Sequence, residues 1–166
     1  MSADRIRLLS CAAALVLAFA LSLASNSALA SAQRTFVAST GNDANAANNC
    51  SLVLPCRSFA AAMVQTQDGG EIVVLDSAGY AAVTIDHSVS IIAPQGLYAG
   101  ITAFSGNAIT IAGTALRVVL RGLTLNTFGP VFANIGINIE PVNDSEILIE
   151  RVAISGFSQR ARVSGG

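Results

Sequence analysis

The 166-residue chain contains no lysine, only one histidine and three cysteines, and 11% of its residues are charged. All of its basic residues are arginine and they are dispersed, whereas phosphate binding requires a clustered positive field. We therefore expect no nucleic-acid partner. Two cysteines, Cys50 and Cys56, and the distant His87 do not make a zinc ligand set, so we expect no metal site and no cofactor.

Motifs of several hydrolytic and calcium-binding sites are also absent. No Gly-x-Ser-x-Gly segment is present to pair with His87, which follows Asp86 and precedes a predicted strand. Asp76 and Asp86 stand alone, without the clustered carboxylates that glycosidases use. No Asp-x-Asp-x-Asp-Gly loop accompanies them to bind calcium. The sequence therefore identifies no catalytic residue.

The first 32 residues have the pattern of a signal peptide. Arg5 and Arg7 supply a positive start, and the apolar run 12–24 is too short for a membrane span. Small residues at 28–32 provide a cleavage site. We expect residues 1–32 to be removed on export and the remaining chain to be secreted or periplasmic, without a membrane span. A retained membrane anchor is the alternative.

Cys50 and Cys56 lie in a polar loop with five residues between them. Exported proteins retain disulfides, and a ring of this size is geometrically possible. We therefore expect a disulfide between Cys50 and Cys56, with two free thiols as the alternative.

From about residue 71, short segments alternate apolar, small or polar, and apolar residues. This period of two is typical of β-strands, and Gly, Asn, Asp, Ser and Pro separate the segments. Strands this short bury little surface alone, but stacked copies bury one another's faces. The segments are 83–85, 89–91, 109–111, 118–120, 123–125, 137–139, 147–149 and 152–154.

Two stretches of this region repeat. Residues 118–125 align with 147–154 at an offset of 29, and 109–111 align with 137–139 at an offset of 28. Repeats of roughly 20 to 30 residues are typical of a parallel β-helix with three short strands per turn. The predicted fold class is therefore all-β, a parallel β-helix. The alternative, an antiparallel sandwich, favours Asn-Gly hairpin turns, which are scarce here.

The preceding segment predicts an opening strand at 34–39, a polar loop at 40–49 and a short helix at 57–67. Ser58 is a capping residue for this helix, and Asp68-Gly69-Gly70 ends it. We expect the helix to cover the exposed core and strand edge of the first turn. The predicted organisation is a signal peptide (1–32), a strand, cysteine loop and capping helix (33–70), and the β-helix (71–166).

Four segments of the chain together resemble exported bacterial proteins with right-handed parallel β-helix repeats. They are residues 34–43, the cysteine loop 50–59, and the segments 69–80 and 88–94. These proteins have the pectin-lyase-like fold, and the resemblance covers about residues 33–157. It implies a right-handed β-helix and an exported location but no defined reaction, because most such proteins are uncharacterised. It also implies a C-terminal truncation, since the segment from Arg160 to the end contains no closing strand or cap.

Polysaccharide lyases of this fold use an arginine or lysine base together with acids that hold calcium. Arg121 and Arg151 are the corresponding bases here, with Asp144, Glu146 and Glu150 as acids. The repeat places Arg121 opposite Glu150. Since arginine resists deprotonation, this placement favours a structural ion pair over catalysis.

Tyr80, Tyr98 and Phe104 are candidates for stacking on sugar rings if exposed, or for core and corner packing if buried. The function that we expect is an exported, non-catalytic protein presenting a long flat face to a polysaccharide or another cell-surface component. One alternative is a carbohydrate-active enzyme, a lyase or hydrolase with an incomplete site. Another is a truncated product without independent function.

Overall fold

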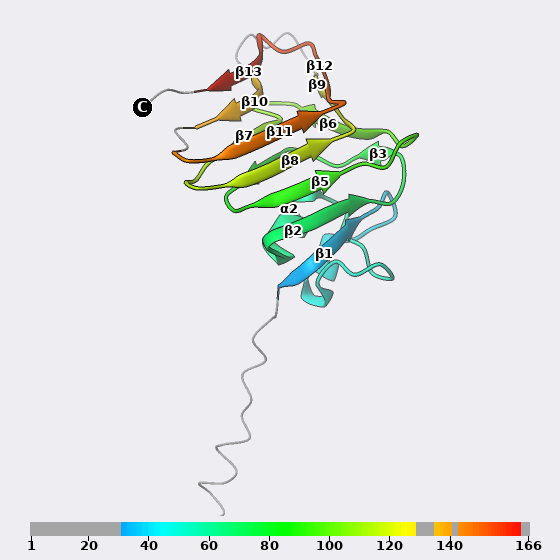
Figure 1. Cartoon of the computed structure of the whole chain (residues 1–166). Coiled ribbons are helices and arrows are strands. Elements are labelled where there is room, and N and C mark those ends of the chain that lie inside the picture. Colours follow the sequence, from blue (N-terminus) through cyan, green and yellow to red (C-terminus); the bar gives the residue numbers. More distant parts are fainter. Residues whose placement is uncertain (1–30, 129–134, 141–142, 164–166) are drawn as a thin grey trace, which may run out of the picture. The chain divides into compact units, whose positions relative to one another are not determined.

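The computed structural model describes residues 31–128, 135–140 and 143–163, and most of its regular structure is β-strand. One 3-10 helix and one α-helix precede the main run of strands (Figure 1). The elements are β1 (Ala32–Val37), η1 (Asp43–Asn48), α2 (Phe59–Gln65), β2 (Thr66–Val74), β3 (Ala78–Gly79), β4 (Val83–Ile85), β5 (Val89–Ile92), β6 (Ala99–Ala103), β7 (Ile109–Ile111), β8 (Arg117–Arg121), β9 (Leu123–Thr127), β10 (Ile135–Ile139), β11 (Glu146–Glu150), β12 (Ala153–Ser155) and β13 (Gln159–Val163).

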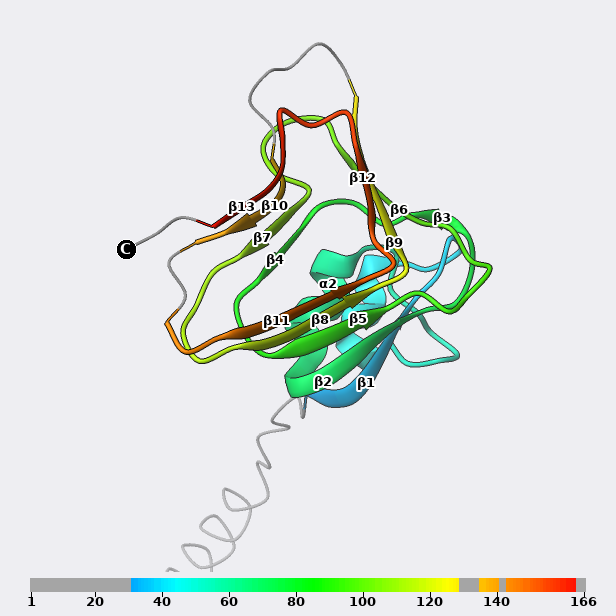
Figure 2. The ribbon, with the colours of Figure 1, turned by 45° about the horizontal axis from the view of Figure 1, so that its top comes forward.

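The strands form three sheets, which the chain visits in rotation. Sheet A has the order β1-β2-β5-β8-β11, sheet B the order β12-β9-β6-β3, and sheet C the order β13-β10-β7-β4. Neighbouring strands within each sheet are parallel. Figure 2 shows the three sheets on three sides of a common interior. The prediction of an all-β protein with parallel strands is confirmed, and the antiparallel alternative is wrong.

The strand register agrees with the internal repeat of the sequence. Ile137 lies opposite Ile109, and Ile147 lies opposite Val118, as the offsets of 28 and 29 predicted. Because side chains alternate between the two faces of a strand, this register places apolar residues of successive strands on one side.

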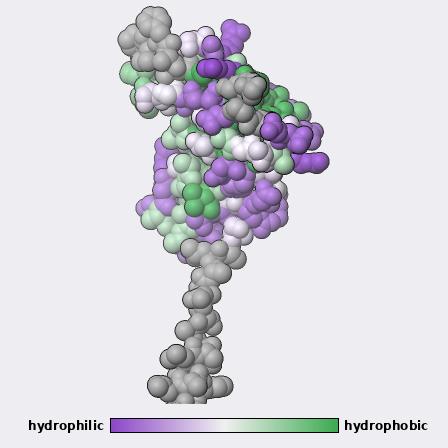
Figure 3. All heavy atoms as spheres, turned by 90° about the vertical axis from the view of Figure 1, so that its left-hand side faces the viewer, coloured by the Kyte–Doolittle hydropathy of each residue, from purple (hydrophilic) through white to green (hydrophobic). Residues whose placement is uncertain are grey.

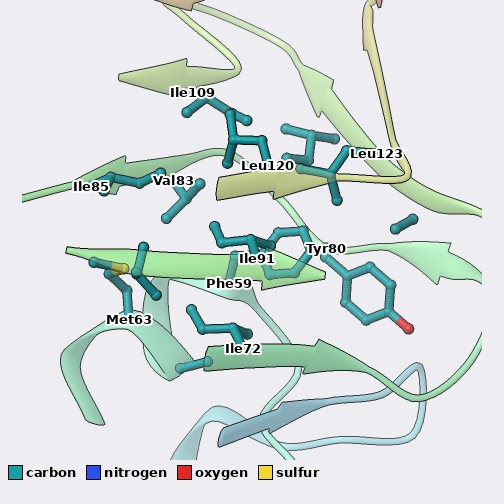
Figure 4. Packing of buried hydrophobic residues seen from close by; sticks show 14 of the residues in the cluster. Phe59, Met63, Ile72, Tyr80, Val83, Ile85, Ile91, Ile109, Leu120 and Leu123 are labelled. Carbon is teal, nitrogen blue, oxygen red and sulfur yellow. The ribbon is translucent and has the colours of Figure 1, made fainter. Parts of the chain in front are cut away.

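Those inward residues make one hydrophobic cluster between the sheets. In sheet A, Ile72, Ile91 and Leu120 lie opposite one another on successive strands and are fully buried. Ile85 of sheet C and Leu123 of sheet B belong to the same cluster (Figure 4). Burial of each such side chain contributes about 1.5 to 3 kcal/mol, which lets strands of three to five residues hold together.

Helix α2 packs against the first strands of the stack. Its buried residues are Phe59, Ala62 and Met63, and it contacts β1, β2 and β4. The Ser58 hydroxyl accepts a hydrogen bond from the Ala61 N–H at 3.2 Å, so the predicted cap is confirmed. The backbone N–H of Phe59 donates to the Tyr80 carbonyl at 3.1 Å, which joins the start of the helix to the end of β3.

The cysteine loop covers the outer edge of sheet A. The Phe36 N–H of β1 donates to the Cys50 carbonyl at 2.8 Å, and the Cys56 N–H donates to the Phe36 carbonyl at 2.9 Å. Cys50 and Cys56 are joined in a disulfide and are fully buried, so the predicted pairing is confirmed in this structure. An edge strand that would otherwise have free backbone groups is thus paired on both sides.

The end of α2 differs from the prediction. The helix ends at Gln65, and β2 begins at Thr66, so Asp68, Gly69 and Gly70 lie inside a strand. The Thr66 hydroxyl donates a hydrogen bond to the Ala62 carbonyl at 2.8 Å. Because its single proton is used there, it accepts a hydrogen bond from the Thr35 hydroxyl, whose oxygen is also 2.8 Å away. Parallel pairing with β1 and β5 outweighs the local helix-stop signal.

Three strands were not predicted, namely β3, β6 and β13. The segment from Arg160 onward was expected to contain no closing strand, but β13 pairs with β10 along sheet C, so that expectation was wrong. The predicted signal peptide lies almost entirely in residues 1–30, outside the described residues, and stays a prediction. Within the described ranges, no helix has the length and hydrophobicity needed to cross a bilayer.

Candidate functional site

The outer surface of sheet B carries exposed aromatic rings. In β6, Ala99, Ile101 and Ala103 are buried, so the alternation of the strand directs Gly100 and Thr102 outward. Strand β9 repeats this pattern next to β6. We call this surface the aromatic face; its residues are Tyr98, Gly100, Thr102, Phe104, Thr124, Asn126 and Phe128.

Tyr98 lies across the aromatic face rather than projecting from it. A Cβ atom on Gly100 would come within 2.6 to 2.7 Å of the Tyr98 ring, so the ring lies directly over this glycine. Its hydroxyl accepts a hydrogen bond from the Asn126 amide at 3.3 Å, and its backbone N–H donates to the Ser77 hydroxyl at 2.9 Å. Tyr98 is 46% exposed, which leaves ring surface free on the solvent side.

Two phenylalanines form the opposite margin of the aromatic face. Phe104 follows β6 and Phe128 follows β9, and their ring centroids are 5.9 Å apart. They are 71% and 70% exposed, although apolar rings of this size are normally buried. The Phe128 N–H donates to the Ala103 carbonyl at 3.2 Å, which continues the strand pairing and holds the two rings side by side.

Hydroxyl and amide groups lie between the aromatic margins. One row across the strands consists of Thr102, Asn126 and Ser155. In the adjacent row, Thr124 lies opposite Gly100. These side chains both donate and accept hydrogen bonds. The face therefore combines flat apolar rings with uncharged hydrogen-bonding groups held on strands.

An open groove of about 670 Å³ borders the aromatic face at Thr102 and Phe104. Its far wall contains Arg57, whose Nη1 donates to the Gly79 carbonyl at 2.6 Å and whose guanidinium lies 5.7 Å from the Tyr80 ring centroid. This arginine thus fixes the wall of the groove to the end of β3.

The same wall is held by Asp43, which sequence reasoning missed. Its carboxylate accepts hydrogen bonds from the N–H groups of Arg57 and Ser58, both at 2.8 Å, and from the Ser58 hydroxyl at 2.9 Å. Only the fold brings Asp43 next to the start of α2, because Arg57 lies 14 positions further along the chain.

The residues proposed for lyase chemistry do not converge. Arg121 Nε lies 2.6 Å from Glu150 Oε2, so the predicted ion pair is confirmed. Asp144 and Arg151 lie in turns at opposite ends of β11, roughly 20 Å apart at the usual rise per strand residue. Glu146 lies opposite Arg117 on the neighbouring strand. These residues therefore line sheet A and its two corners rather than one site.

Asp86 and His87 occupy the turn between β4 and β5. Asp86 Oδ1 is 2.7 Å from His87 Nδ1, and His87 Nε2 is buried without a hydrogen-bond partner among the described residues. The pair borders a second groove, of about 500 Å³, between α2 and sheet C. In the described part of the chain, no three His, Cys, Asp or Glu side chains are grouped so as to hold a metal ion.

Asp76, which follows β2, is joined by hydrogen bonds to Ser39 after β1 and to Tyr80 after β3. Tyr80 is fully buried, so it packs in the core and does not stack on a ligand; Figure 4 shows its hydroxyl pointing away from the aliphatic cluster. That hydroxyl donates to Asp76 Oδ1 at 2.5 Å. Hydrogen bonds from the Ser39 hydroxyl and from Tyr80 hold the pKa of Asp76 below its ordinary value. Burial, followed by the hydrogen bond to Asp76, raises the pKa of Tyr80.

Of the three aromatic candidates in the sequence, the structure brings Tyr98 and Phe104 onto one face and buries Tyr80. Phe128 was missed. A signal for it exists in the sequence, because Phe128 stands two residues after Asn126 as Phe104 stands two residues after Thr102.

Comparisons of this chain with protein families, with curated proteins and with solved structures found no match. The resemblance to exported β-helix repeat proteins therefore stays a prediction. A function for the aromatic face has to follow from its own geometry and chemistry.

Proposed function

We propose that this chain is an exported, non-catalytic right-handed parallel β-helix protein that binds polysaccharide through the aromatic face. The observation that carries the proposal is the seating of Tyr98 flat over Gly100, opposite the exposed pair Phe104 and Phe128. Aromatic rings have electron-rich faces, and the C–H-lined faces of sugar rings complement them.

The hydrogen-bonding rows between the rings supply the second part of the recognition. Thr102, Thr124 and Asn126 are outward residues of strands that the core holds in register. Sugar hydroxyls both donate and accept hydrogen bonds, as do these side chains. Groups fixed on strands lose little conformational entropy when they bind a ligand, which favours a strand face over a mobile loop as a binding surface.

The β-helical and exported parts of the proposal have separate support. The chain places one strand in each of three parallel sheets before returning to the first, and crossover connections between parallel strands are right-handed in about 98% of cases. The disulfide Cys50–Cys56 and the signal-peptide pattern at 1–32 both fit an oxidising compartment outside the cytoplasm.

Affinity electrophoresis of the purified chain, in gels that contain neutral or acidic soluble polysaccharides, tests the binding. We expect retardation by at least one polymer. Tyr98→Ala should weaken binding about fivefold, and the double variant Phe104→Ala/Phe128→Ala about 25-fold, since each lost stacking contact corresponds to about 1 kcal/mol. Val53→Ala is the control, because Val53 is an exposed apolar residue outside sheet B.

Gly100→Ala tests the seating of the ring without removing it. The added methyl group would occupy the space under Tyr98 and lift the ring, while the exposed ring end can move at little cost in stability. We therefore expect weaker polysaccharide binding with nearly unchanged urea unfolding. If none of the polymers binds, or if the aromatic-face variants bind as tightly as Val53→Ala, the proposed function is wrong.

A further inference from the structure

The described outward positions of sheet B contain no residue that is charged at neutral pH. Beyond the aromatic residues, they are glycine, alanine, threonine, serine and asparagine. The two rows are Gly79, Gly100, Thr124 and Ala153, and Thr102, Asn126 and Ser155.

The charged residues that lie on described strands belong to the other two sheets. On sheet A, Arg34 lies 2.5 Å from Glu71 and Arg121 lies 2.6 Å from Glu150, so these charges are paired across neighbouring strands. On sheet C, one outward row runs across four neighbouring strands. It consists of Thr84, Thr110, Asn138 and, on β13, Arg162. Figure 3 shows hydrophilic and hydrophobic residues interspersed on another side of the molecule. Sheet B is therefore the sheet without a charge at its described outward positions, whereas sheet C carries charge on β13 and sheet A on several strands.

The cation in the groove beside the aromatic face is already engaged. Arg57 donates to the Gly79 carbonyl and lies against the Tyr80 ring, and the carboxylate of Asp43 lines the same groove. A ligand carboxylate in this groove would be repelled by Asp43, and the Arg57 guanidinium is already hydrogen-bonded within the protein. Arg151 lies at the corner between sheets A and B and lines a hollow together with Leu97, the neighbour of Tyr98, so it is the described cation to test as a partner of an acidic ligand.

The charge of the chain after the predicted signal peptide also disfavours an anionic ligand. After residue 32 the sequence has nine acidic and seven basic residues, so its net charge is near −2. Polyanions are attracted by clustered positive charge, and the described part of sheet B presents none on its outer surface.

We infer that the aromatic face selects a neutral glycan, built of hydroxylated sugar rings without carboxylates, over a glycan that contains uronic acids. This inference rests on the proposed function, because it specifies the ligand of the same face. Its physical basis is that a buried or partly buried carboxylate needs a compensating cation, whereas a hydroxyl needs only the neutral partners that Thr102, Thr124 and Asn126 provide.

Two cellulose derivatives that share one backbone test the inference. Hydroxyethylcellulose is neutral and carboxymethylcellulose is acidic, and each is titrated with the full purified chain in about 20 mM and about 500 mM NaCl, which span strong and weak charge interactions. We expect at least about tenfold tighter binding of the neutral polymer, with an affinity that changes less than about twofold with salt. Arg151→Ala should bind both polymers as the wild type does.

Three results would overturn the inference while leaving the proposed function standing. They are equal or tighter binding of carboxymethylcellulose, a neutral-polymer affinity that falls steeply with salt, and a loss of acidic-polymer binding in Arg151→Ala. If neither derivative and no other polymer of the panel binds, the proposed function fails and the inference fails with it.

Discussion

Replacing Asp76 by asparagine should destabilise this protein at neutral pH and much less at low pH. The Asp76 carboxylate accepts hydrogen bonds from the Ser39 N–H at 2.7 Å, the Ser39 hydroxyl at 2.5 Å and the Tyr80 hydroxyl at 2.5 Å. Ser39 follows β1 and Asp76 follows β2, so this carboxylate ties together the corners of the two strands nearest the disulfide loop.

The expected size of the effect follows from these three contacts. A hydrogen bond to a charged group contributes about 1.5 to 3 kcal/mol, and an asparagine oxygen keeps part of that as neutral bonds. Asp76 is only partly buried, so water replaces some of the lost interactions. We expect a loss of about 2 kcal/mol in the free energy of unfolding for Asp76→Asn. Tyr80→Phe keeps the ring, 5.2 Å from that of Phe59, and should cost about 1 kcal/mol.

The pH dependence has a defined sign. The pKa of Asp76 is lowered in the folded chain from its ordinary value of 3.8, mainly by the hydrogen bond from the Ser39 hydroxyl and then by the one from Tyr80. A carboxyl with a depressed folded pKa stabilises the fold fully above its unfolded pKa, and this contribution is lost as the pH falls through the folded value. The difference between wild type and Asp76→Asn should therefore be constant above about pH 5 and shrink below the unfolded value.

Urea unfolding at pH 7, pH 5 and about pH 3 measures this difference directly. Asp144→Asn is the matched control, since it removes the same charge from an exposed turn and should change stability by less than about 0.5 kcal/mol. An equal loss for Asp76→Asn at all three pH values, or no loss at pH 7, would refute the role given to this carboxylate.

Four further results are expected. Gly41→Ala should destabilise by about 1 to 3 kcal/mol in urea unfolding, because a Cβ there would lie 2.1 Å from the Cys56 carbonyl oxygen, which is backbone and cannot rotate away. Replacing Cys50 and Cys56 by serine should cost about 2 kcal/mol in the same assay, as the chain-entropy estimate gives for so short a loop, and mass spectrometry of the exported protein should find no free thiol at either position. A double-mutant cycle on Arg121 and Glu150 should give a coupling below about 1 kcal/mol, because both side chains are partly exposed. The same purified chain should release no product from polysaccharides with or without calcium; turnover abolished by Arg121→Ala would show that this pair is catalytic.

The sequence alone predicted the features that depend on local alternation and on repetition. The offset of 29 between 118–125 and 147–154 placed Arg121 opposite Glu150, because residues that repeat at a fixed spacing occupy equivalent positions in parallel strands. The short ring between Cys50 and Cys56 and the cap at Ser58 were equally local, since each depends on neighbours only a few residues away.

Other elements were decided by contacts between segments far apart in the chain. Strand β6 consists largely of alanine and glycine, which have little preference for strands, and it forms because β3 and β9 pair with it. The start of β2 at Thr66 depends on β1, 31 residues earlier, whose Thr35 hydroxyl meets it. The strand propensity of a single segment does not include the free energy of pairing with distant strands, so the sequence alone did not predict these elements.

The aromatic face shows the same division. Tyr80 and Tyr98 are both tyrosines close to short strands, and the sequence assigned neither to the core nor to the surface. The fold buries Tyr80 against Phe59 and lays Tyr98 over Gly100, because the ring of each residue goes where neighbouring strands leave space for it. In the segments that it predicted as strands, the sequence by itself determined which residues alternate inward and outward. Only the tertiary structure decided which outward rings meet on one surface, since that depends on how successive strands stack.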